Sequence, residues 1–167
     1  FIVAEAALNG WVAQDPKEHY ENGIKASFAF YQSYANDVTG ANDYSSFVNE
    51  EKAEGIANII LKHYKCLDGI IFNAAILEKM SNIEGFDLKT WQKVINVNLT
   101  SSFVLLKYLI PLIQKSLLPR IIFTTSGISK KARAFWGPYA ISKAGINTLA
   151  DILIDELESV SNIKIFN

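Results

Sequence analysis

Short apolar runs alternate with longer amphipathic stretches along most of this chain, and this alternation restricts the possible folds more than any other feature. Three runs rich in isoleucine and phenylalanine have the length of buried strands, at 67–72, 121–125 and 163–166. Around them, apolar residues recur at every third or fourth position, which predicts helices over 47–64, 88–115 and 139–160. Such alternation predicts an α/β fold built on a parallel sheet.

The helical segments also carry local signals for their buried faces and their ends. In the first helix the predicted buried face carries Ile56, Ile59, Ile60 and His63. The second helix is expected to begin after Asp87, whose carboxylate can accept from the free backbone N–H groups of the first turn. Pro111 lacks a backbone donor, so this helix should kink or end near it.

Composition bounds the class of protein. The 167 residues suit a single domain with a sizeable core, and the net charge of −1 gives no reason to expect nucleic acid or an anionic membrane as a partner. The single cysteine, Cys66, excludes an internal disulfide and fits a cytoplasmic protein. His19 and His63 lie far apart in sequence, so no metal site is expected. The most apolar stretch, 103–118, contains Lys107 and is shorter than a membrane span, which predicts a buried helix.

Two residues of the last predicted helix can act together chemically. Tyr139 and Lys143 lie four positions apart, so they share one helix face. An ammonium beside a phenol stabilises the phenolate, and the pair can then exchange a proton with an alcohol or carbonyl oxygen. Taken alone, the same spacing also fits an ordinary amphipathic helix.

Two further polar residues stand at positions that predict a site. Ser126 directly follows a predicted strand, and ligands of open parallel sheets bind at the carboxyl ends of strands. Asn98 interrupts an apolar helix, where a buried amide needs partners, a local kink or a bound water. The alternatives are a turn serine and an asparagine bonded to its own helix backbone.

Together these residues resemble the short-chain dehydrogenase/reductase family. Residues 139–143 match its Tyr-x-x-x-Lys signature, and 124–127 resemble its serine motif at the matching offset. Val97-Asn98 resembles its helix asparagine, again at the family's offset. Residues 72–75 resemble its Asn-Asn-Ala-Gly strand end, with Phe72 and Ala75 as departures, and 37–38 resemble its acidic strand end.

The resemblance implies a fold, an activity and a role for each residue. The fold would be a Rossmann-like doubly wound parallel sheet with helices on both faces. Tyr139 would be the acid/base, Lys143 would stabilise its phenolate and bond the nicotinamide ribose, and Ser126 would orient the substrate oxygen. Asn98 would hold a water in a proton relay. The cofactor, NAD or NADP, would also be lined by Asp37, Val38, Asn73, Ala74 and Ala75, and the substrate would be a small carbonyl compound or alcohol.

Part of the family pattern is not recognisable in this sequence. Residues 1–36 show no clear pattern, although a helix is possible over 4–13 and a strand over 27–34. Neither the family's first strand nor its glycine-rich turn can be recognised among them. We therefore expect residues 1–167 to be a single partial domain of a bacterial classical-type member, as a fragment or an incompletely represented chain.

The resemblance also bears on activity and assembly. The alternative to an enzyme is a non-catalytic or truncated interaction module with the same fold and no cofactor. A homodimer or homotetramer is expected because the helices over 88–115 and 139–160 correspond to those that pair across subunits in the family. Phe103, Leu106 and Tyr108 would supply apolar surface for that pairing, and the alternative is that they only pack on the sheet.

Overall fold

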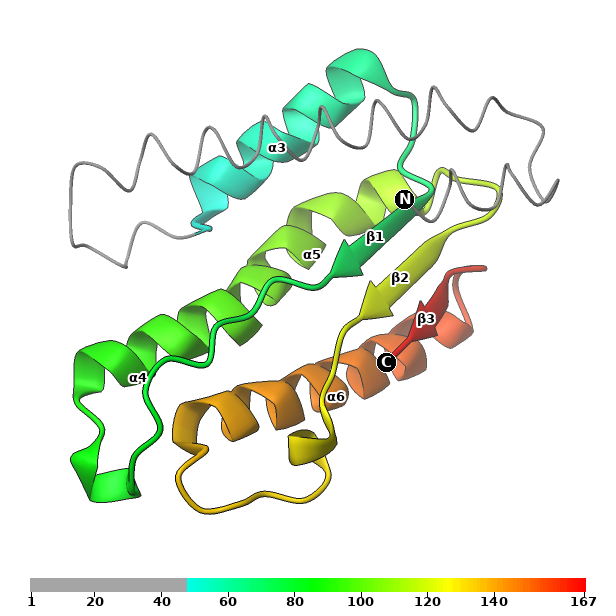
Figure 1. Ribbon diagram of the computed structural model, residues 1–167. Coiled ribbons are helices and arrows are strands. Elements are labelled where there is room, and N and C mark those ends of the chain that lie inside the picture. The colour runs from blue at the N-terminus through cyan, green and yellow to red at the C-terminus, as the bar shows by residue number, and fades with distance from the viewer. Residues whose placement is uncertain (1–47) are drawn as a thin grey trace, which may run out of the picture. The chain divides into compact units, whose positions relative to one another are not determined.

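Three parallel strands form a sheet in the computed structural model, which describes residues 48–167 (Figure 1). Their order is β1 (Gly69–Phe72), β2 (Arg120–Phe123) and β3 (Lys164–Phe166), with β2 in the middle. All three lie within two residues of the predicted runs, so the parallel α/β architecture is confirmed. The predictions for 1–36, Asp37 and Val38 fall outside the described residues.

The register of the sheet brings the ends of β1 and β2 to the same level. Phe72 pairs with Phe123, and their rings stack with centroids 5.0 Å apart. The Thr124 N–H then donates to the Phe72 carbonyl at 3.0 Å, which extends the pairing by one residue. The segments that leave β1 and β2 therefore start side by side, at the edge where parallel sheets bind ligands.

The helix α3 (Glu50–His63) precedes β1 and packs on α5 (Ser101–Ile113). Its Asn49 cap accepts from the Lys52 N–H at 2.8 Å. The buried side chains are Ala53 and Ala57, with Ile56 and Ile60 beside them. The prediction was wrong for Ile59, which is 63 % exposed, and for His63, because the helix contacts its neighbour through the small alanines on an adjacent stripe.

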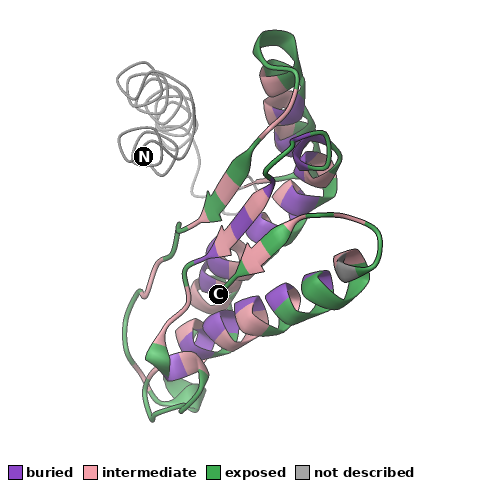
Figure 2. Cartoon of the chain, turned by 90° about the vertical axis from the view of Figure 1, so that its right-hand side faces the viewer, coloured by how far each residue is buried: buried purple, intermediate pink, exposed green. Residues whose placement is uncertain are grey.

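The core lies on one face of the sheet. The side chains of Ile121 and Phe123 on β2 point into it, and α5 and α6 (Gly137–Glu158) cover them. Buried positions follow the middle strand and the helix sides that pack against it (Figure 2). Each fully buried aliphatic or aromatic side chain of this kind contributes about 1.5–3 kcal/mol. The helices among the described residues thus cover one face only, where the resemblance predicted helices on both.

One long helical segment connects β1 to β2. It consists of α4 (Leu88–Ile95), the π-helical turn η3 (Asn96–Thr100) and α5, which ends two residues after Pro111. Two short 3₁₀ turns, η2 (Ile83–Gly85) and η4 (Gly127–Ser129), lie in the loops after β1 and β2. By length and composition the segment from Leu88 to Ile113 could cross a membrane. Its Leu106 and Ile113 instead pack against β2, as predicted for a buried helix.

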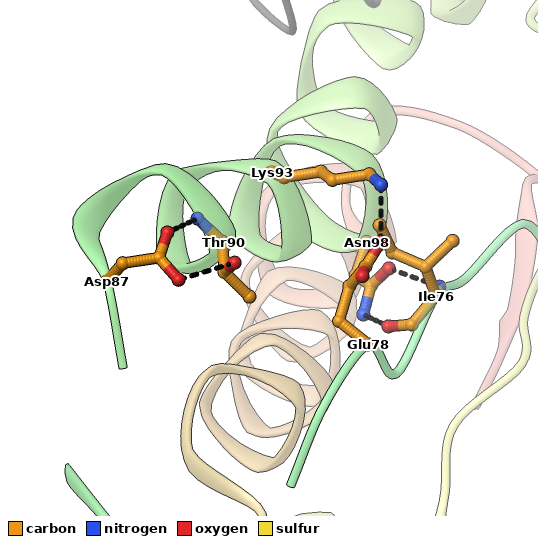
Figure 3. Close-up of polar contacts among 6 residues, drawn as sticks. All are labelled: Ile76, Glu78, Asp87, Thr90, Lys93 and Asn98. Carbon is orange, nitrogen blue, oxygen red and sulfur yellow. Dashed lines mark hydrogen bonds and ion pairs between the residues drawn. The ribbon is translucent and has the colours of Figure 1, made fainter. Parts of the chain in front are cut away.

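Asp87 caps α4 as predicted (Figure 3). Its Oδ1 accepts from the Thr90 N–H at 2.7 Å and its Oδ2 from the Thr90 hydroxyl at 2.9 Å. These bonds, with Lys79 nearby, hold the pKa of Asp87 at about 2. A carboxylate whose folded pKa is depressed stabilises the protein above its unfolded value, and that contribution is lost as the pH falls towards 2.

We therefore predict that Asp87→Asn lowers the melting temperature near neutral pH by removing a charge while keeping a good capping side chain. The difference between wild type and variant should shrink as the pH falls from about 4 to about 2. Thermal unfolding followed by circular dichroism across this range measures it. A difference that stays constant with pH would contradict the role given to the carboxylate charge.

Candidate functional site

The helix α6 brings Tyr139 and Lys143 to the end of β2. Pro138 stands in its first turn, where a missing backbone donor costs nothing. One turn after Tyr139, the Lys143 Nζ donates to the Thr124 carbonyl at 2.7 Å and lies 6.0 Å from the centroid of the Tyr139 ring. The structure therefore brings together the tyrosine, the lysine and the strand end that the sequence pattern had linked.

Lys143 is held in an unusual state for a lysine. It is only 3 % exposed, and burial lowers its pKa from the ordinary lysine value. Burying an ammonium is costly unless its hydrogen bonds are satisfied. The Thr124 carbonyl takes one of its three N–H donors. Within residues 48–167 no other acceptor for this ammonium is seen, so two of its donors remain unused.

Ser126 lies three residues beyond β2, because the strand ends at Phe123 and not at Thr125 as predicted. Its backbone is extended, and its carbonyl accepts from both the N–H and the hydroxyl of Ser129, at 3.0 and 2.6 Å. The Ser126 Oγ accepts weakly from the Ile128 N–H at 3.5 Å. Because the oxygen is the acceptor there, the hydroxyl hydrogen is left to donate to a ligand oxygen.

Asn98 sits inside the π turn and is 2 % exposed. Its Oδ1 accepts from the Ile76 N–H at 2.8 Å, and its Nδ2 donates to the Ile76 carbonyl at 2.9 Å (Figure 3). Nδ2 also donates to the Ser142 hydroxyl at 3.0 Å, which in turn donates to the Tyr139 carbonyl at 2.8 Å. The partners are thus the loop after β1 and the helix α6, not the backbone of its own helix.

This bonding restricts what Asn98 can do for a water molecule. Both N–H groups of the amide and one lone pair of Oδ1 are already used. The side chain therefore acts first as a pin between two chain segments, and its role in a water relay stays a prediction. The π turn matches the local kink that an asparagine inside an apolar helix had suggested.

The loop after β1 presents the residues predicted to line a cofactor. Asn73, Ala74 and Ala75 follow the strand directly and are exposed. Further along, Glu78 has a φ of 59° and pairs with Lys93 on α4 (Figure 3). The strand β1 fixes the chain before Asn73, and the Asn98 bonds to Ile76 together with this ion pair hold it after Ala75, so the three residues lie between two fixed points.

Aromatic side chains flank Tyr139. The Trp136 ring lies 5.9 Å from the Tyr139 ring, tilted by 52°. The preceding residue, Phe135, is 56 % exposed and has a φ of 74°, which is unusual for a bulky residue. Its carbonyl accepts from the Ser81 N–H at 3.2 Å, so the loops after β1 and β2 touch here.

Sequence reasoning missed Ser142, which belongs to this arrangement. Ser142 is fully buried and joins the Asn98 amide to α6, but its hydroxyl looked like a small filler within the Tyr-x-x-x-Lys run. Its position one residue before Lys143, on a face that must be buried, was the available signal. Within residues 48–167, no three histidine, cysteine or acidic side chains gather as metal ligands.

Comparison with known proteins gives a consistent set of relatives. A family model described as short chain dehydrogenase matches residues 41–167. The uncharacterized oxidoreductase YciK of Escherichia coli is 32 % identical over 117 residues, which are 70 % of this chain and 46 % of that protein. A benzil reductase of Saccharomyces cerevisiae is 32 % identical over 114 residues, which are 65 % of this chain and 43 % of that protein.

Solved structures agree with the sequence relatives. A short chain dehydrogenase from Salmonella enterica superposes with a TM-score of 0.68 at 32 % identity, over 71 % of this chain and 48 % of that one. A Shigella flexneri protein described as a short chain dehydrogenase complexed with NADP superposes with a TM-score of 0.67 at 30 % identity, over 71 % and 48 %. The chain thus spans about half the length of the relatives that it matches.

The hydrogen bonds from Asn98 to Ile76 and Ser142 lead to a prediction about stability. Asn98→Leu keeps the volume but leaves the Ile76 backbone groups and the Ser142 hydroxyl without their partner, so the free energy of unfolding should fall by about 1–3 kcal/mol. Chemical denaturation measures the loss. The control is Asn96→Leu, the same substitution two residues earlier in the π turn. Equal losses in the two variants would contradict the pinning role.

Proposed function

The chain belongs to the short-chain dehydrogenase family, and we propose that it carries the catalytic part of an enzyme that interconverts a carbonyl and an alcohol by hydride transfer with NAD or NADP. One observation carries the proposal. The buried Lys143 ammonium is held by the Thr124 carbonyl beside the Tyr139 ring, at the strand end that Ser126 follows. A protein that only binds a partner has no evident need for a buried ammonium in that place.

In the proposed reaction Tyr139 exchanges a proton with the substrate oxygen. The Lys143 ammonium lies 6.0 Å from the centroid of the Tyr139 ring and places a positive charge beside the reacting groups. The Ser126 hydroxyl donates to the same substrate oxygen, which fixes its direction and polarises the carbonyl. Acid–base catalysis by a positioned side chain accelerates reactions by about 10²–10⁴-fold. Asn98 supports the unit by holding α6 to the loop after β1.

The described residues fit one side of a nicotinamide cofactor. Asn73, Ala74 and Ala75 present small, exposed side chains at the end of β1, and the free Lys143 donors suit ribose hydroxyls. When bound, the cofactor supplies the hydride, while the protein positions and polarises. Two similar solved structures are described as complexes with NADP or NADPH, so NADPH is the first cofactor to test and NADH the second.

We infer that the substrate is a small carbonyl compound with apolar or aromatic substituents. Phe135 and Trp136 place aromatic surface on the residues that lead into Tyr139. The related yeast protein is named for the reduction of benzil, an aromatic diketone. Benzil is therefore a reasonable probe substrate for this chain.

Assembly and localisation remain predictions. Phe103 is 56 % exposed on α5 and is available to a second copy, whereas Leu106 is 3 % exposed and belongs to the core, so its assignment to an interface was wrong. We propose a homo-oligomer that uses the exposed side of α5.

A cytoplasmic localisation and the absence of membrane and nucleic-acid partners are proposed on composition alone.

We predict that Tyr139→Phe abolishes NADPH-dependent reduction of benzil by the intact protein, because only the hydroxyl that transfers the proton is lost. The rate should fall by at least about 10²-fold, while the melting temperature and the Kd for NADPH stay close to those of wild type. Absorbance of NADPH at steady state and a fluorescence titration measure the two effects. Wild-type turnover in this variant would contradict the proposed mechanism.

A further prediction concerns the affinity for NADPH when Lys143 is replaced. Lys143→Met removes a charged donor from the ribose site, so the Kd for NADPH should rise by at least about 10-fold, since a hydrogen bond to a charged group contributes about 1.5–3 kcal/mol. The melting temperature should change little, because the removal of a buried ammonium offsets the loss of the donor to the Thr124 carbonyl. Lys115→Met, at an exposed position beyond α5, is the control. An unchanged Kd in Lys143→Met would remove the ribose role.

A further inference from the structure

Three polar side chains form a closed network between the end of β2 and α6. The Thr125 hydroxyl lies 2.6 Å from the Asn147 Oδ1, and the Asn147 Nδ2 lies 2.8 Å from the Ser129 Oγ. Ser129 in turn donates to the Ser126 carbonyl at 2.6 Å. The proposed reaction gives no part to Thr125, Ser129 or Asn147, although the network ends on the residue that would bind the substrate oxygen.

The shorter contacts of this network use both hydroxyl hydrogens, while the Thr125 and Ser129 oxygens lie 3.2 Å apart in a contact where either could donate. Each hydroxyl has a single hydrogen. The Thr125 hydrogen points to Asn147 and the Ser129 hydrogen to the Ser126 carbonyl, both across 2.6 Å. In this arrangement the Asn147 amide presents its oxygen to Thr125 and its nitrogen to Ser129. Reversing the amide would draw the Ser129 hydrogen away from Ser126, so the amide orientation determines whether Ser126 keeps this bond.

Ser126 depends on its neighbours because its own hydroxyl is weakly held. The Ile128 N–H reaches the Ser126 Oγ only at 3.5 Å. The backbone on either side is fixed instead, through the Thr125 side chain before it and through its own carbonyl, which receives both donors of Ser129. The direction of the Ser126 hydroxyl is thus set by where Asn147 holds these two flanking groups.

The position of Asn147 on α6 makes this coupling effective. Tyr139, Lys143 and Asn147 follow one another at intervals of four residues, so they share one helix face. Lys143 holds the Thr124 carbonyl, and Asn147 holds the next residue and the turn after it. The helix that carries the acid/base therefore also sets the position of the serine.

We propose that Asn147 is a positioning residue for the reaction, which holds Ser126 through Ser129 and Thr125 in the orientation that receives the substrate oxygen. This inference rests on the proposed function. Asn147 touches neither the substrate nor the cofactor in this role. It acts on the rate because a displacement of about 1 Å in a group that binds the reacting oxygen can cost about 10²-fold.

The test is a double-mutant cycle in the intact protein with NADPH and benzil. Asn147→Leu removes both amide bonds at nearly constant volume, and Ser129→Ala removes the hydroxyl between Asn147 and Ser126. We expect kcat to fall about 10- to 100-fold in each single variant, while the Kd for NADPH stays within about twofold. The double variant should be no slower than the worse single variant, because both changes break one network.

Two further variants separate positioning from a general loss of structure. Asn147→Gln retains an amide and should recover part of the rate lost in Asn147→Leu. Thr148→Ala removes a neighbouring hydroxyl that bonds only to the Ala144 carbonyl of its own helix, and it should keep the wild-type rate. A thermal unfolding curve for each variant shows whether a change in rate follows a change in stability.

Wild-type kcat in Asn147→Leu, or fully additive losses in the double variant, would overturn the assignment. So would a Kd for NADPH that rises in parallel with the loss of rate, since that is the mark of a distorted α6. The same assay includes Tyr139→Phe. If wild type turns over and Tyr139→Phe does not, the proposed function stands whatever Asn147 does, whereas a wild-type protein that binds neither NADPH nor NADH would overturn both proposals.

Discussion

The hydrogen bond from Lys143 to the Thr124 carbonyl is the contact on which the site depends. A buried ammonium is unfavourable on its own, and burial indeed lowers the pKa of Lys143. The Thr124 carbonyl, just after β2, offsets part of that cost. It can do so only when α6 is positioned along the strand so that Lys143 reaches this carbonyl. The lysine therefore links the polar part of α6 to the end of β2, and the Tyr139 ring lies one turn earlier on the same helix. The remaining cost is one that a bound ligand with hydroxyl acceptors would reduce.

The buried side of α6 changes character along its length. In its first half polar groups face the strand ends, where Ser142 meets Asn98, Lys143 meets Thr124 and Asn147 meets Ser129. In its second half the buried residues are apolar and pack against β2 and α5, among them Ala150 and Leu153. The second half of α6 thus packs on the sheet through apolar side chains, and its first half carries the polar groups of the candidate site. A substitution that disturbs the packing of the core would therefore also displace the candidate site residues, because α6 carries both.

The sequence predicted the parts of the fold that local patterns control. Strand positions followed from apolar runs, and the start of α4 followed from the capping chemistry of Asp87. The buried face of α3 was predicted wrongly because periodicity cannot distinguish a stripe of isoleucines from an adjacent stripe of alanines. Only contact with α5 selects Ala53 and Ala57. Leu106 was assigned to the surface for the same reason, since an apolar residue fits a core and an interface equally well.

Some candidate site residues could be chosen from the sequence, but their hydrogen bonds could not. Tyr139, Lys143, Ser126 and Asn98 were singled out by type and spacing, and the structure brings the lysine, the tyrosine and the strand end together. The partner of Asn98 lies in a loop far away in sequence, which no local pattern encodes. Asn147 escaped notice because a polar residue on a helix normally reads as a solvated position. Contacts between segments far apart in the sequence determine the partners of both Asn98 and Asn147.

The central claim is that the ends of β1 and β2 form one wall of a nicotinamide site, and hydrogen exchange tests it without knowledge of the substrate. Backbone exchange would be measured on the intact protein with and without saturating NADPH, and then NADH. The account predicts slower exchange at residues 73–76 and 124–129 on binding, with little change along α3. Binding that protects other segments and leaves both strand ends unchanged, or no protection by either cofactor in the folded protein, would contradict it.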